Sequence, residues 1–154
     1  MESLHWPEGY KVEQYVPKEW FENWPFSLVF FWLGKPLWIY KDRFKPVIIE
    51  IETQLISRPK PSHAVWGTDQ NRVKMAQDVC AIVKDIYGWP NDYFIPQDPF
   101  DVVFQMTFGE FELAECIVRF QEELSVNIGN QEAEKWSGKS MGDMVDCLLA
   151  RREP

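Results

Sequence analysis

The sequence predicts an all-α protein with two parts, a helical domain at residues 68–154 and an aromatic-rich N-terminal extension. Three stretches of the domain carry apolar residues at the spacing of one helix face: residues 68–87, 109–124 and 140–149. The middle stretch shows the pattern best, and its apolar stripe consists of Leu113, Ile117, Phe120 and Leu124. Because each stretch has one apolar face, we expect the helices to bury a common interior.

Composition and charge restrict the class of protein. Hydrophobic residues make up 45% and charged residues 26% of the 154 residues, which is typical of a globular chain. The net charge is −8, and a phosphate backbone must be met by Lys and Arg, so we expect no nucleic-acid partner. The excess acid lies in residues 68–154, which hold sixteen acidic and eight basic side chains, whereas residues 1–67 hold eight of each.

The extension at residues 1–63 is rich in Trp and Pro and is expected to pack on the helical domain. Residues 17–24 predict a short helix with Pro17 at its first position. Residues 26–33 are apolar apart from one Ser, and both a buried strand and a buried helix remain open there.

A longer helix is expected at residues 42–56, with Pro46 near its start. Its apolar stripe consists of Ile48, Ile51 and Leu55. A strand through residues 47–51 is the alternative. Six of the eight Trp residues lie in residues 1–67, and they either complete the core of the domain or line a pocket.

Residues 57–63, with two prolines among polar and charged residues, predict a loop and a domain boundary near residue 63. Thr68 or Asp69 is expected to cap the next helix, and Gly88 to end it. The stripe of this helix consists of Val73, Ala76, Cys80 and Val83, with Val79, Ile82 and Ile86 beside it.

The helix at residues 109–124 has two different faces. We expect two further residues to widen its apolar stripe, Ala114 and Val118. Three carboxylates lie off the stripe and form an acidic outer face: Glu112, Glu115 and Glu122. Glu110 and Glu112 fall in the first turn, where the helix dipole favours negative charge.

The chain from Glu115 to Leu149 resembles the C-terminal half of an acyl carrier protein, almost without gaps. In that family a Glu-rich helix is followed by a short Glu-Ala-Glu-Lys helix and by a last helix that opens with Val-Gly-Asp. Here residues 132–135 read Glu-Ala-Glu-Lys and residues 141–143 read Met-Gly-Asp. The preceding loop also matches, through Ile95, Pro96, Asp98 and Phe100. The resemblance implies a four-helix bundle at residues 68–152, with Phe100 in its core.

One departure from the family pattern concerns the cargo. Gly109-Glu110-Phe111 stands where the family has Asp-Ser-Leu, so Glu110 replaces the serine that carries the phosphopantetheine arm. A carboxylate has no hydroxyl from which to form the phosphodiester. The nearest hydroxyls belong to Thr107 and to Ser125, which lies at the end of the helix. We therefore expect no phosphopantetheine and no other cofactor.

The resemblance implies a role in protein recognition, because in the family this acidic helix docks on basic patches of partner enzymes. We expect a non-enzymatic interaction or regulatory module whose protein partner carries a basic patch. The residues expected to contact that partner are Glu110, Phe111, Glu112, Glu115 and Glu122. The alternative is a small ligand-binding protein or enzyme with a pocket formed by the Trp-rich extension.

Catalytic residues and metal ligands are not expected. His5 and His63 lie in expected loops without Cys or carboxylate neighbours at metal-ligand spacing. The three cysteines fall in expected helices among apolar neighbours, which indicates buried free thiols of a cytoplasmic protein: Cys80, Cys116 and Cys147. The start of the chain lacks a signal-peptide pattern, and no apolar run approaches the roughly 20 residues of a membrane span.

Overall fold

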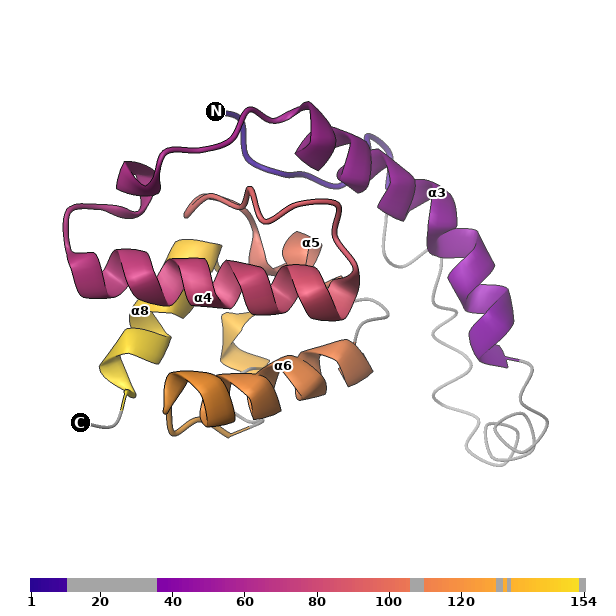
Figure 1. Cartoon of the computed structure of the whole chain (residues 1–154). Coiled ribbons are helices and arrows are strands. Elements are labelled where there is room, and N and C mark those ends of the chain that lie inside the picture. The colour runs from indigo at the N-terminus through magenta and orange to yellow at the C-terminus, as the bar shows by residue number, and fades with distance from the viewer. Residues whose placement is uncertain (11–35, 106–109, 130–131, 133, 153–154) are drawn as a thin grey trace. The chain divides into compact units, whose positions relative to one another are not determined.

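A computed structural model describes residues 1–10, 36–105, 110–129, 132 and 134–152 of the chain (Figure 1). The α-helices are α3 (Pro36–Ser57), α4 (Gln70–Tyr87), α5 (Phe100–Val103), α6 (Glu110–Leu124) and α8 (Met141–Ala150). Two 3-10 turns accompany them, η2 (His63–Trp66) and η3 (Glu134–Trp136). The described residues form no strand beyond two isolated bridges, so the all-α class is confirmed for this part of the chain. The elements expected at residues 17–24 and 26–33 lie outside the described residues.

The chain divides into two compact units. One consists of Met1–His5 with Glu52–Pro154 and is called the helical unit below; the other is Trp6–Ile51. The boundary expected near residue 63 therefore falls inside the helical unit. The reason is that the stretch expected to be a loose linker contains Arg58, which is only 7% exposed and is bonded within the unit.

Helix α3 resolves the choice between helix and strand for residues 47–56 in favour of the helix. It begins at Pro36, earlier than expected, so Pro46 lies inside it instead of near its start. Pro46 lacks the N–H that a helix interior uses, and its side chain is exposed. The buried stripe of the helix is Phe44, Val47, Ile51 and Leu55, whereas Ile48 is half-buried. In the unit Trp6–Ile51, the ring of Trp6 also stacks on that of Tyr10 at 4.8 Å.

Helix α4 begins and ends as the sequence predicts. Asp69 is its N-cap, and its side chain accepts the N–H of Asn71 at 2.9 Å. Gly88 follows the helix with φ 70°, a left-handed conformation that glycine adopts without strain. Most of the expected stripe is buried, together with Met75: Ala76, Val79, Cys80, Ile82 and Val83. Val73 and Ile86 are half-buried.

Helix α4 is the central element of the helical unit, because it packs against η2, α6 and α8 (Figure 1). Aromatic side chains fill the interior beside it. Phe100 stacks on Phe104 at 4.3 Å and meets Trp136 edge-on at 5.7 Å. Each of the three is at most 2% exposed, so Phe100 lies in the core as expected.

The start of α8 is hydrogen-bonded to the loop before α5. Ser140 caps the helix and forms a capping box with Asp143. The amide of Met141 donates to the carbonyl of Asp98 at 2.8 Å, and the amide of Gly142 donates to that of Pro96 at 2.9 Å. A Cβ on Gly142 would lie 3.1 Å from both Cβ and the carbonyl oxygen of Pro96. The loop and the helix therefore approach closely at Gly142, and a side chain there would have to displace Pro96 slightly.

The three cysteines are free, as expected. Cys80 and Cys116 are buried, and Cys147 is half-buried. Burial raises the pKa of the Cys80 thiol and raises that of Cys116 to about 12, so both thiols are held in their neutral form. Among the described helices, none combines the length and apolarity that a bilayer span requires.

Candidate functional site

Helix α6 is the element that the sequence singles out for function, and its inner face is buried. Five side chains are at most 9% exposed: Leu113, Cys116, Ile117, Phe120 and Leu124. Four of them form the expected stripe, and Cys116 widens it. The expectation that Ala114 and Val118 widen the stripe is wrong, because both are exposed. Val118 lies roughly 140° around the helix axis from Leu113, and it is 48% exposed.

The outer face of α6 combines carboxylates with this exposed apolar residue. Glu115 and Glu122 precede and follow Val118 by three and four residues, which places all three on one face. Both carboxylates are exposed, and Glu112 is half-buried. The acidic outer face expected from the sequence is therefore present, but its centre is apolar.

The one basic residue of α6, Arg119, is already engaged. Its guanidinium bonds Glu123 and Asp85 of α4, each at 2.6 Å, and these hydrogen bonds raise its pKa. Among the described residues no ion pair joins Glu112, Glu115 or Glu122. In the described part of the chain, no Lys or Arg side chain neutralises these three carboxylates through an ion pair.

The start of α6 bears on the expected cargo site. The helix begins at Glu110, the position of the family's serine. Thr107 and Gly109 lie outside the described residues, and the side chains of Glu110 and Phe111 are not described. Ser125 follows the last residue of the helix and has a positive φ of 53°, so its hydroxyl belongs to the opposite end of α6.

The remaining candidate residues of the sequence have structural surroundings. His63 bonds Gln77 through its ring nitrogen, and the main chain of His5 bonds Gln54. Trp66 is 4% exposed and is therefore buried in the helical unit. The guanidinium carbon of Arg72 lies 6.0 Å from its ring centre. The described residues contain no cluster of three or more His, Cys, Asp or Glu that could hold a metal ion.

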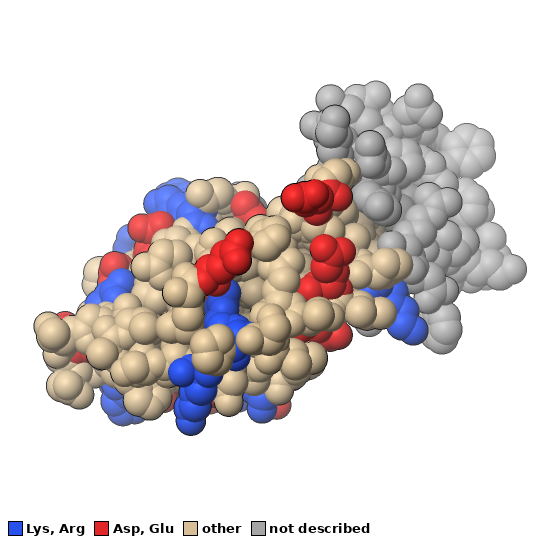
Figure 2. Space-filling model, turned by 90° about the horizontal axis from the view of Figure 1, so that it is seen from above, with Lys and Arg blue, Asp and Glu red and all other residues tan. Residues whose placement is uncertain are grey.

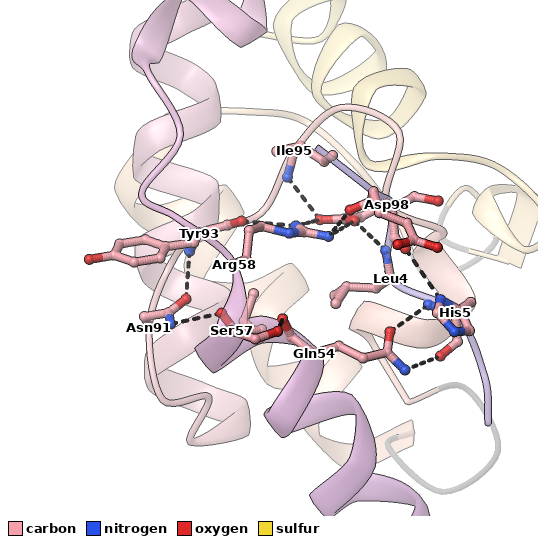
Figure 3. A network of polar contacts seen from close by, with 12 residues as sticks. Leu4, His5, Gln54, Ser57, Arg58, Asn91, Tyr93, Ile95 and Asp98 are labelled. Atoms are coloured by element: carbon pink, nitrogen blue, oxygen red, sulfur yellow. Dashed lines mark hydrogen bonds and ion pairs between the residues drawn. The ribbon is translucent and has the colours of Figure 1, made fainter.

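A buried ion pair in the helical unit was not anticipated from the sequence. Arg58 donates to both carboxylate oxygens of Asp98, at 2.6 and 2.8 Å (Figure 3). The same carboxylate accepts the amides of Leu4 and Ile95, each at 2.8 Å. Arg58 also donates to the carbonyls of Glu2 and Tyr93, at 2.7 and 2.9 Å. The spacing of apolar residues could not have predicted this pair, because Arg58 and Asp98 lie in two irregular segments.

The charges elsewhere on the surface are mixed. The face shown in Figure 2 carries Lys and Arg as well as Asp and Glu side chains, with uncharged residues among them. The comparisons add no relative: no family model matches the chain, and searches of curated proteins and of solved structures find no significant match.

Proposed function

We propose that this chain is a non-enzymatic interaction module, built as an acyl-carrier-like four-helix bundle at residues 68–152, which binds a protein partner through the outer face of α6. One observation carries the proposal: Val118 is 48% exposed between two exposed carboxylates, Glu115 and Glu122. Protein interfaces commonly combine an apolar centre with a polar rim. A partner with a basic rim around an apolar socket would complement this face.

The order of the elements supports the bundle. A long helix α4 is followed by a long loop with the short α5, then by α6, the short turn η3 and the last helix α8. This is the order in which the carrier family places its helices. The loop residue Phe100 is buried, and Gly142 in the Met-Gly-Asp motif lies where a Cβ would be 3.1 Å from Pro96.

Glu110 supports a role without cargo. It is the first residue of α6, and it places a carboxylate in the sequence where the family attaches its arm through a phosphate ester. Negative charge at a helix N-terminus is stabilised by the helix dipole. The proposed module therefore offers the charge of a loaded carrier without a transferable group.

The proposal is tested by competition for an enzyme that recognises carrier proteins through a basic patch. The probe is a broad-specificity phosphopantetheinyl transferase loading a conventional acyl carrier protein. We expect this chain to inhibit loading, and to inhibit less as salt screens the charges. Glu115→Lys should weaken the inhibition about tenfold, the effect of losing roughly 1.4 kcal/mol of binding.

The matched control is Asp92→Lys, which makes the same charge change at an exposed residue in the loop after α4. Asp92→Lys should leave the inhibition unchanged within about twofold, because a charge outside the interface contributes little to binding. Absence of inhibition by the unmodified chain, or an equal loss in both variants, would contradict the docking role of α6.

A further inference from the structure

The first five residues are hydrogen-bonded to the rest of the helical unit through their main chain. The carbonyl of Glu2 accepts from Arg58 at 2.7 Å, and the amide of Leu4 donates to Asp98 at 2.8 Å. The side-chain amide of Gln54 accepts from the N–H of His5 at 3.1 Å and donates to its carbonyl at 3.0 Å (Figure 3). Backbone groups supply the segment's side of all four bonds, so these bonds do not depend on its side chains.

One side chain of the segment is buried. Leu4 is 1% exposed, whereas Met1, Glu2 and His5 are exposed. A site that bonds the main chain of an extended segment and buries a single apolar side chain has the properties of a peptide-recognition site. Affinity comes from the main-chain bonds, and selectivity comes from the pocket of the anchor residue.

The residues that bond this segment are also held in place by hydrogen bonds that do not involve Met1–His5. Arg58 and Asp98 bond each other, and they also bond the carbonyl of Tyr93 and the amide of Ile95. The side chain of Asn91 fixes the same loop, because it donates to the carbonyl of Leu55 at 3.2 Å and accepts the amide of Tyr93 at 3.0 Å. Departure of the segment would leave one acceptor on Asp98 and one donor on Arg58, aimed at the vacated place.

We propose that Gln54, Arg58 and Asp98 form a binding site for an extended peptide, and that Met1–His5 is a detachable strap which occupies it. The ligand class is an unfolded or extended protein segment with an apolar residue at the position of Leu4, which replaces the strap. Recognition is by main-chain N–H and C=O groups and by the burial of one apolar side chain. This site is separate from the outer face of α6, and the proposal does not depend on the role of α6.

Hydrogen exchange in the unmodified protein tests whether the strap detaches. The amides of Leu4 and Ile95 donate to the two oxygens of the Asp98 carboxylate at the same distance, 2.8 Å. The Leu4 amide therefore reports on the strap, and the Ile95 amide reports on the site. We expect the Leu4 amide to exchange at least about tenfold faster than the Ile95 amide, because the strap opens locally while the site stays folded. Equal protection of the two amides would overturn the proposal.

Binding in trans tests whether the vacated site accepts a peptide. Leu4→Asp removes the apolar anchor, and His5→Asp is the control that adds the same charge at an exposed neighbour. The probe is the peptide acetyl-Glu-Ser-Leu-His-amide, followed through the NMR signal of the Ile95 amide. We expect a saturable shift with Leu4→Asp, and at least about tenfold weaker binding to the unmodified protein and to His5→Asp, where the tethered strap competes.

A peptide with Asp in place of Leu should produce no shift in any of the three proteins. Absence of a saturable shift in folded Leu4→Asp would overturn the proposal. Unfolding of Leu4→Asp would overturn it as well, because a detachable strap must leave the unit folded. Equal binding by Leu4→Asp and His5→Asp would show that the peptide binds elsewhere, with the same consequence.

Discussion

Arg58 and Asp98 form a bidentate ion pair in the interior of the helical unit, although they lie 40 residues apart in the chain. Their side chains are 5% and 0% exposed. A charge withdrawn from water to this extent is tolerated only when its partner and further hydrogen bonds replace the lost hydration. The pair therefore joins the end of α3 to the loop before α5, and residues 2–4 bond to both of its members.

Asp98→Ala should destabilise the protein by about 3–5 kcal/mol, because it leaves the guanidinium of Arg58 buried without its counterion. The measurement is urea unfolding followed by circular dichroism. Asp78→Ala is the control, since it breaks the exposed pair with Lys74 and should cost no more than about 1 kcal/mol. Similar losses in the two variants would mean that the Arg58 pair is solvated.

Ile117→Ala and Leu148→Ala should each cost about 2–5 kcal/mol, because both side chains are at most 4% exposed and their truncation leaves cavities. Val118→Ala, on the outer face of α6, should change stability by less than about 0.5 kcal/mol. Chemical denaturation of the three variants checks the assignment of the helix faces. A loss at Val118 as large as that at Ile117 would show that α6 is rotated about its axis.

Gly142→Ala should destabilise by about 1–3 kcal/mol, because the new Cβ meets the Cβ and carbonyl oxygen of Pro96 at 3.1 Å. Gly129→Ala is the matched control, since a Cβ there meets nothing within 4 Å. Thermal unfolding of both variants gives the comparison. A Gly142→Ala protein at least as stable as the parent would show that the loop before α5 yields at no cost.

The chain should gain no mass when it is incubated with coenzyme A and a broad-specificity phosphopantetheinyl transferase, because Glu110 offers a carboxylate where the arm needs a hydroxyl. Intact-mass spectrometry gives the answer directly. In Glu110→Ser, we expect the mass of one phosphopantetheine to appear. An adduct on the unmodified chain would refute a role without cargo, and the adduct's position would identify the residue that carries it.

Local sequence was sufficient for α4, α6 and α8, but it did not predict the short helix α5. Asp69 and Gly88 mark the ends of α4 through interactions within one turn, and the stripe from Leu113 to Leu124 predicts the buried face of α6. The same reasoning gave Ala114 and Val118 the wrong environment. Apolar residues at the edge of a stripe are buried or exposed according to the neighbouring segment, and periodicity does not describe that segment.

The sequence by itself determined that residue 110 has no hydroxyl, that the excess acid lies in residues 68–154, and where α4 and α6 run, because these are properties of single residues and of local spacing. Only the tertiary structure decided that Arg58 belongs to a buried ion pair and not to a solvated linker. The physical reason is that burial of a charge depends on which distant segments meet around it. For Arg58 these are the segments that carry Glu2, Tyr93 and Asp98.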